Sequence, residues 1–186
     1  MLELLDTRIW ADAAIDRIVG PGWCNAGRSS QRLRAKAMKP TLVLACGNTL
    51  RGDDGVAWHI GSALRDELAS SEMEVILTQQ LLPEHAEPLS KSHTAIFLDC
   101  SAIAQPGVVS THTVYAAKSL PRIFTHHLDP ASLLKLTHDL YGRIPSRAVS
   151  ITVGGESFEL QEELSKPVRD AIPIALEAVR RAYGHP

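Results

Sequence analysis

The chain has 186 residues, about the length of one domain, and 45% of them are hydrophobic and 22% charged, a composition typical of globular proteins. Its 19 basic and 21 acidic residues give a net charge of −2, which argues against nucleic acid or an anionic membrane surface as a partner. No apolar run approaches the roughly 18 residues of a membrane span, and the three cysteines stand far apart without a C-x-x-C pair. We therefore expect a cytoplasmic protein, because a reducing compartment suits unpaired cysteines.

Residues 1–38 differ in character from the rest of the chain. An amphipathic helical pattern over 4–19 is followed by Gly-Pro-Gly and by a polar stretch containing several arginines and lysines. This composition predicts a loosely attached N-terminal extension, with the main domain spanning 39–186. Alternatively, translation begins at Met38, immediately before the first strand, and the upstream residues are not part of the protein.

Beyond the extension, short apolar runs alternate with segments of helical periodicity. The runs predict strands at 41–46, 74–78, 94–98, 108–115 and 147–153. The helical spacing predicts helices at 55–69 and 84–89, one that begins at Asp129 and Pro130, and one that begins at Ser165. Strands that alternate with helices form a mostly parallel sheet. We therefore predict a single α/β domain of three layers, with a twisted sheet of about five strands and helices on both faces.

The loop at 47–55 follows the first strand and precedes the first helix of this domain. It contains three glycines and the adjacent acids Asp53 and Asp54, and it is expected at the carboxyl edge of the sheet, where open α/β folds bind ligands. A glycine loop in this position also suggests phosphate binding. However, two carboxylates would repel a phosphate, and the G-x-G-x-x-G spacing is absent. A nucleotide-binding module is therefore the less favoured alternative.

Polar residues gather at three places on the same predicted edge, namely Asp53-Asp54, Asp99 and His126-His127. Two carboxylates and an imidazole form a plausible ligand set for a divalent transition metal, and imidazole favours nickel, zinc or copper over magnesium. Each place also has an ordinary explanation, because an acid after a strand often caps a helix and a loop histidine is often solvated. Their coincidence on one edge is what favours a metal site.

The remaining candidate groups have structural explanations. Cys46 and Cys100 end buried strands, where a free cysteine behaves as a small hydrophobe. The other histidines are expected at the surface: His59, His85, His93, His112, His138 and His185. The chain has no G-x-S-x-G turn, H-E-x-x-H pair or catalytic cysteine signature, which argues against a conventional covalent hydrolase.

Four stretches together resemble a known family: GNTLRGDDGV (47–56), AIFLDCS (95–101), THHLDPASLL (125–134) and VGGESFEL (153–160). The chain resembles the hydrogenase maturation endopeptidases over about 39–183. The resemblance implies an enzyme that removes a short C-terminal peptide from the large subunit precursor of nickel-iron hydrogenase after the metal centre has been assembled. A non-cleaving accessory protein that senses nickel is the alternative, because it would need the same ligands.

The resemblance also implies the site residues. It places metal ligands at Asp54, Asp99 and His126, with His127 as the alternative to His126, and it makes Asp54 and Asp99 the candidate catalytic carboxylates. The metal would be nickel supplied by the precursor, although zinc or cadmium could occupy the site in vitro. We expect water polarised by this metal to cleave the peptide. Alternatively, the metal only anchors the precursor.

The sequence departs from the family pattern after the second strand. Many members have Asp-Gly-Gly there, whereas this chain has Thr78, Gln79 and Gln80, and Ala57 replaces the last common glycine of the first loop. We expect Gln79 and Gln80 to contact the substrate. The QLLPE stretch at 80–84 resembles the variant found in maturases of the NAD-linked, bidirectional hydrogenases.

Overall fold

The structure is a computed structural model of the chain, and it describes residues 39–67, 72–120 and 128–184. Every structural statement below concerns these residues. The predicted N-terminal extension at 1–38 therefore lies outside the described residues, and its attachment stays a prediction. No helix within the described ranges is both long enough and apolar enough to cross a bilayer.

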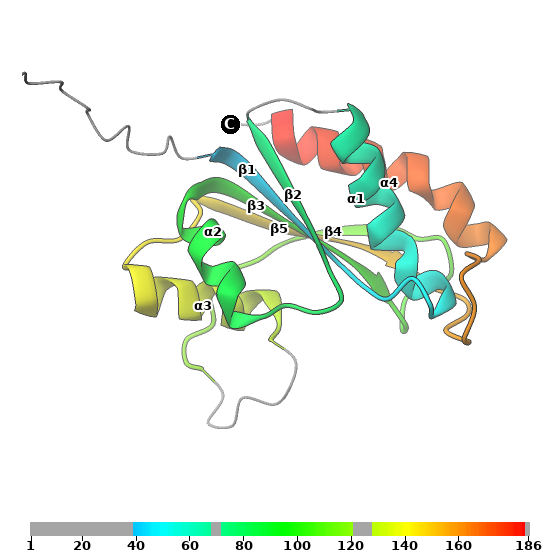
Figure 1. Cartoon of the computed structure of the whole chain (residues 1–186), viewed down its shortest axis with the longest axis horizontal. Coiled ribbons are helices and arrows are strands. Elements are labelled where there is room, and N and C mark those ends of the chain that lie inside the picture. Colours follow the sequence, from blue (N-terminus) through cyan, green and yellow to red (C-terminus); the bar gives the residue numbers. More distant parts are fainter. Residues whose placement is uncertain (1–38, 68–71, 121–127, 185–186) are drawn as a thin grey trace, which may run out of the picture. The chain divides into compact units, whose positions relative to one another are not determined.

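A single five-stranded sheet forms the centre of the domain (Figure 1). Its strands are β1 (Lys39–Cys46), β2 (Met73–Thr78), β3 (Ser92–Ser101), β4 (Val109–Thr113) and β5 (Arg147–Gly154). They lie in the order β2-β1-β3-β5-β4, and all neighbours are parallel except β4, which pairs antiparallel with β5 at the edge. The predicted mostly parallel sheet is confirmed.

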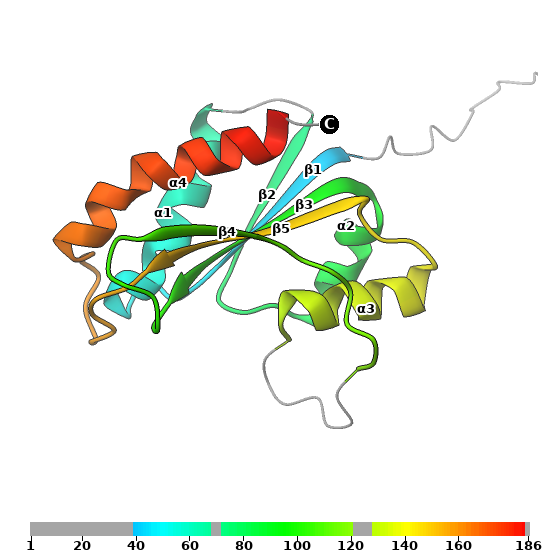
Figure 2. The same cartoon turned by 180° about the vertical axis from the view of Figure 1, so that it is seen from behind.

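Helices cover both faces of this sheet. They are α1 (Val56–Glu67), α2 (Ala86–Ser90), α3 (Pro130–Tyr141) and α4 (Lys166–Gly184), with short 3-10 turns η1 (Gly52–Gly55) and η2 (Pro83–His85) before α1 and α2. Helices α1 and α4 pack on one face and α2 and α3 on the other, as the front and back views in Figures 1 and 2 show. The domain therefore has the three predicted layers.

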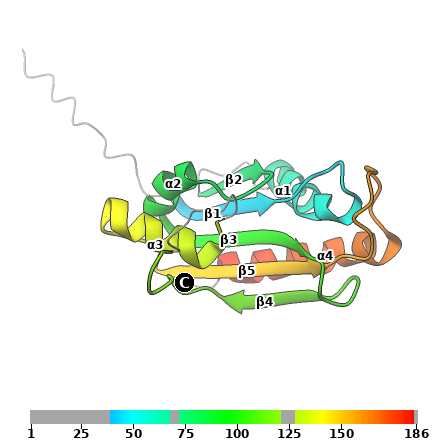
Figure 3. The ribbon, with the colours of Figure 1, turned by 90° about the horizontal axis from the view of Figure 1, so that it is seen from below.

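The central strands explain why the apolar runs are continuous rather than alternating. Along β1, Val43 and Ala45 pack under α1 and α4, whereas Leu42 and Leu44 pack under α2 and α3. All four side chains are at most 1% exposed. A strand that is buried on both faces needs apolar residues at every position, and parallel strands bring their carboxyl ends to one edge of the sheet (Figure 3).

One expectation about the histidines is wrong. His85 is buried, and its Nδ1 accepts a hydrogen bond from the Leu82 N–H at 2.9 Å. Burial lowers the pKa of His85, against the opposing charge of Glu84, so the ring is a neutral part of the turn before α2. Four other histidines are exposed as predicted, namely His59, His93, His112 and His138. His185 lies outside the described residues.

Candidate functional site

The loop after β1 turns back on itself because of Gly47. This residue has a φ of +150°, and a Cβ added to it would lie 1.9 Å from the carbonyl oxygen of Asp54. Only glycine permits so close an approach. The loop is closed further by the Asn48 N–H, which donates to Oδ2 of Asp54 at 2.8 Å. Gly47 and Asn48 thus fix both the backbone and the carboxylate of Asp54.

The adjacent acids Asp53 and Asp54 have different environments. Asp53 is fully buried, and its carboxylate accepts hydrogen bonds from the N–H groups of Glu156 (2.7 Å), Ser157 (2.9 Å) and Ser165 (2.6 Å). Burial disfavours the ionised form, but these hydrogen bonds outweigh it and lower the pKa of Asp53. Asp53 is therefore a structural anchor, whereas Asp54 is only partly buried and is available to a ligand.

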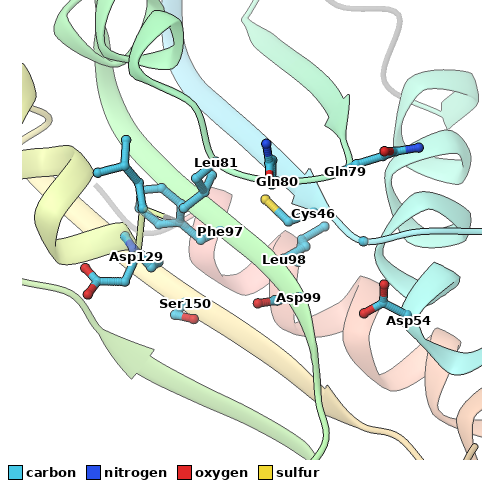
Figure 4. A pocket seen from close by; sticks show the side chains of 13 residues that line it. Cys46, Asp54, Gln79, Gln80, Leu81, Phe97, Leu98, Asp99, Asp129 and Ser150 are labelled. Carbon is cyan, nitrogen blue, oxygen red and sulfur yellow. The ribbon is translucent and has the colours of Figure 1, made fainter. Parts of the chain in front are cut away.

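Asp54 and Asp99 line one pocket of about 460 Å³. Figure 4 shows these two carboxylates towards one end of it and the side chains of Leu81 and Phe97 towards the other. The other lining residues are Cys46, Gly47, Gln79, Gln80, Leu98, Leu128, Asp129, Pro130 and Ser150. A pocket of this size takes a drug-sized ligand or a few residues of a peptide.

Asp99 lies near the end of β3, two positions after Phe97, so both side chains are on the face of the sheet that α2 and α3 partly cover. Much of the residue is exposed, but its carboxylate lies within the concave pocket. Burial there and the charge of Asp54 raise the pKa of Asp99 to about 6, against the hydrogen bond from the Cys100 N–H at 2.8 Å. This carboxylate can therefore take up a proton near neutral pH.

The two described cysteines are poor nucleophiles. Cys46 and Cys100 are free thiols, and burial together with the nearby carboxylates raises the pKa of each to about 12. A protonated thiol is inert in nucleophilic attack. The expectation that these cysteines have no catalytic role as nucleophiles agrees with their surroundings.

Gln79 and Gln80 follow β2 and line the same pocket. Their backbone is held by Thr78, whose Oγ1 donates to the Gln80 carbonyl oxygen at 2.8 Å. The carbonyl oxygen of Thr78 in turn accepts the indole N–H of Trp58 at 3.0 Å, which joins the end of β2 to α1. The two glutamine amides are therefore placed where a bound peptide could reach them.

The predicted histidine ligand, His126, and its alternative, His127, lie outside the described residues. Leu128, the first residue described after them, lines the pocket. Among the described residues, no group of three or more His, Cys, Asp or Glu side chains could hold a metal ion. Two carboxylates still offer the oxygen donors that divalent cations take, so the assignment of Asp54, Asp99 and His126 as ligands stays a prediction.

Sequence reasoning missed several residues of this pocket. The sequence indicates Asp129 only as a helix start, and Asp129 does cap α3, since its carboxylate accepts the Ser132 N–H at 2.7 Å. Ser150 and Leu81 belong to β5 and to the loop after β2, and neither residue type carries a signal for a ligand site. In the sequence, only their expected position near the carboxyl edge of the sheet indicates that Ser150 and Leu81 could line a ligand site.

The surroundings of the pocket argue against phosphate binding. The Asn48 amide, which would face a phosphate in a nucleotide-binding loop, donates to the carboxylate of Asp54 instead. Asp54, Asp99 and Asp129 line the pocket, and no lysine or arginine is among its lining residues. Such a pocket favours a cation over an anion.

Comparison with known proteins relates the fold to solved structures. No family model and no curated protein matches the chain. The hydrogenase maturating endopeptidase HybD from E. coli is 24% identical, with a TM-score of 0.62, over 77% of this chain and 91% of that chain. A hydrogenase 2 maturation peptidase from a Thaumarchaeota archaeon is 24% identical, with a TM-score of 0.58, over 78% of this chain and 99% of that chain.

A third match is the NiFe hydrogenase maturation protease HycI from Thermococcus kodakarensis. It is 19% identical, with a TM-score of 0.59, over 79% of this chain and 94% of that chain. Identities below 25% show similarity of fold. The described domain therefore has the fold of these maturation endopeptidases, as the sequence resemblance predicts.

Proposed function

We propose that this protein is an endopeptidase that removes the C-terminal extension from the large subunit precursor of a nickel-iron hydrogenase. The observation that carries the proposal is the placement of Asp54 and Asp99 in one pocket at the carboxyl edge of the sheet. The solved structures that share this fold include hydrogenase maturation proteases by name, which supports a precursor of this kind as the substrate.

In this proposal, Asp54 and Asp99 bind the nickel ion that the precursor carries, and His126 supplies a third ligand. The ion belongs to the substrate, so only a metal-loaded precursor completes the site. The pocket then selects its substrate by the presence of the metal, and Gln79 and Gln80 contact the peptide beside it. Zinc or cadmium can replace nickel in a purified preparation.

The chemistry of cleavage follows from the same residues. A bound divalent cation would polarise the attacking water, lower the pKa of that water and stabilise the charge that develops on the oxygen of the scissile carbonyl group. Whichever carboxylate is not fully engaged with the ion, Asp54 or Asp99, accepts a proton from the attacking water. A general base works best when its pKa is near the operating pH; before an ion binds, burial and the charge of Asp54 raise the pKa of Asp99 to about 6.

The compartment and the choice of hydrogenase are further parts of the proposal. The free thiols of Cys46 and Cys100 suit a reducing compartment, and we place the enzyme in the cytoplasm. The QLLPE stretch at 80–84 favours a precursor of the NAD-linked, bidirectional type. Precursors of several hydrogenases, tested side by side, would identify the one that is processed.

The experiment is incubation of the purified protein with a nickel-loaded precursor, followed by mass spectrometry of the large subunit. The wild type should shorten the precursor, and Asp54→Asn, Asp99→Asn and His126→Ala should each lose this activity. Asp170→Asn is a matched control, because Asp170 is exposed on α4 and forms an ion pair there with Lys166. Undiminished cleavage by all three site variants would overturn the ligand assignment and the mechanism.

The same experiment separates cleavage from sensing. If the wild type binds the nickel-loaded precursor without shortening it, the protein is an accessory that senses nickel, not a peptidase. If a site variant still binds the precursor but does not cleave it, the substituted carboxylate has a direct role in the chemistry. Loss of both binding and cleavage would instead indicate that the ligand anchors the precursor.

A further inference from the structure

Two exposed leucines lie on neighbouring loops, the loop after β1 and the loop before α4. Leu50 is 50% exposed and Leu160 is 87% exposed. They precede Arg51 and Gln161, which form a parallel β-bridge. Two backbone hydrogen bonds make this bridge. The Gln161 N–H donates to the Leu50 carbonyl oxygen at 3.1 Å, and the Gly52 N–H donates to the Gln161 carbonyl oxygen at 2.7 Å. Paired positions of neighbouring parallel segments are adjacent in space, so the two leucines form one surface, here called the leucine ridge.

The leucine ridge has a fixed base. The loop that carries Leu160 is held to the first loop by the Asp53 carboxylate, which accepts the N–H groups of Glu156 and Ser157. The two loops also approach closely, because a Cβ on Gly52 would lie 2.8 Å from the Ser157 carbonyl oxygen. The backbone beneath the two exposed side chains is therefore fixed, so little backbone conformational entropy is lost when a partner binds.

The leucine ridge belongs to the same loop as the candidate site. Leu50 lies four positions before Asp54, which lines the pocket, and Figure 1 shows the loop after β1 beside the loop before α4 at one end of the sheet. The pocket of about 460 Å³ admits only a few residues of a peptide. The folded part of a protein substrate must therefore rest on the rim around it.

The surroundings of Leu160 are mainly acidic, although the exposed Arg51 of the β-bridge is a basic neighbour. Four exposed glutamates flank it within eight residues of sequence: Glu156, Glu159, Glu162 and Glu163. None of them forms a salt bridge with another described residue. A partner that fits this surface presents an apolar patch surrounded by lysine or arginine side chains.

We infer that the leucine ridge is a docking surface for the folded body of the protein substrate. The part of the substrate that contacts the ridge is apolar at its centre and carries basic side chains around that centre. This inference rests on the proposed function, since the occupant is the precursor whose tail enters the pocket. Docking at the leucine ridge strengthens binding of the precursor without touching the reacting atoms. It therefore lowers KM and leaves kcat unchanged.

The test measures cleavage kinetics of the nickel-loaded precursor with Leu160→Asp and Leu50→Ser. KM should rise about tenfold or more, a change typical of a residue at the centre of an interface, while kcat stays within about twofold. Ile174→Asp is the matched control, because Ile174 is 55% exposed but lies on α4. An unchanged KM in Leu160→Asp, or an equal rise in Ile174→Asp, would overturn the inference.

Salt and binding measurements extend the test. Raising the NaCl concentration from about 50 mM to about 300 mM should raise KM for the wild type and much less for a Glu159→Gln, Glu162→Gln double variant, since screening weakens contacts between exposed charges. Equal salt dependence would contradict the basic character of the partner.

Sedimentation tests whether a second copy of this chain occupies the same surface. If the wild type is a dimer and Leu160→Asp is a monomer, a second copy covers the leucine ridge, and the inference is overturned.

Failure of the inference differs from failure of the proposed function. If the wild type cleaves the precursor and Leu160→Asp has the same KM, the docking surface is wrong and the function stands. If the wild type binds the precursor without cleaving it, calorimetry still tests the inference: Leu160→Asp should bind the precursor more weakly than the wild type, and an equal affinity would overturn the inference. If the wild type neither binds nor cleaves it, both are wrong.

Discussion

The carboxylate of Asp53 accepts a hydrogen bond of 2.6 Å from the N–H of Ser165, the residue that precedes α4. With its bonds to Glu156 and Ser157, it joins the loop after β1 to the whole segment between β5 and α4. The neighbouring Asp54 is thereby fixed at the pocket, and the leucine ridge is fixed beside it. Asp53 is thus the link between the fold and both proposed functional surfaces.

Asp53→Asn should destabilise the protein by about 3 kcal/mol. The neutral amide is a weaker acceptor than the carboxylate, and its NH2 group faces backbone N–H donors, so at least one buried donor loses its partner. Urea unfolding followed by circular dichroism measures the change. Asp170→Asn makes the same chemical change on the surface and should cost less than about 1 kcal/mol; an equal loss in both variants would contradict the anchoring role.

The contribution of Asp53 should also depend on pH. The pKa of Asp53 in the folded state lies below the value of about 3.9 expected in the unfolded chain. The stabilisation is therefore fully present above the unfolded pKa and is lost as the pH falls through the folded pKa. The difference in unfolding free energy between wild type and Asp53→Asn should shrink between about pH 5 and about pH 3. A constant difference across this range would show that the ionised form is not what stabilises the loop.

The sheet could be predicted from the sequence because its central strands are unambiguous. The runs around Val43 and Ile96 are apolar at every position, since both faces are buried, and parallel strands place Asp54 and Asp99 at one edge. The role of Asp53 could not be predicted, because its hydrogen-bond partners lie 103 to 112 positions later in the chain. The burial of His85 likewise depends on the turn that its ring helps to close.

Gly47→Ala should both destabilise the protein and abolish processing. The added Cβ would lie 1.9 Å from the Asp54 carbonyl oxygen, so the loop must move and displace the carboxylate that lines the pocket. We expect a cost of about 2 kcal/mol or more. Gly142→Ala is the control: Gly142 also has a positive φ, +67°, but no atom lies within 4 Å of its added Cβ. Gly142→Ala should cost about 1 kcal/mol and leave precursor cleavage intact.

Asp99→Asn should stabilise the protein at neutral pH while it removes activity. The pKa of Asp99 is about 6 in the folded state and about 3.9 in an unfolded chain, so the folded state binds the proton more tightly. The stability of the wild type therefore falls as the pH rises from about 4 to about 6. Above pH 6, the free energy of unfolding of the variant should exceed that of the wild type by at most about 1 kcal/mol, because Asp99 is partly screened by solvent. Below about pH 4, the two free energies should be equal. A loss of stability at pH 7 would contradict the raised pKa.

Binding of a divalent ion should weaken steeply as Asp99 takes up a proton. Only an ionised carboxylate is a good ligand, so the affinity of the wild type for Zn²⁺, measured by calorimetry, should fall as the pH is lowered from about 7 to about 5. Asp54→Asn and Asp99→Asn should each bind Zn²⁺ about tenfold or more weakly at pH 7. The proposed ligand His126 must also lose its proton to bind an ion, so its contribution is removed first: in His126→Ala, adding Asp99→Asn should abolish most of the remaining pH dependence. Asp129 also lines the pocket, but its carboxylate is engaged by the Ser132 N–H, so we expect Asp129→Asn to keep most of the affinity. If Asp129→Asn alone abolished binding, the ion would lie at the N-terminus of α3, and the assignment of Asp54 and Asp99 as its ligands would be wrong.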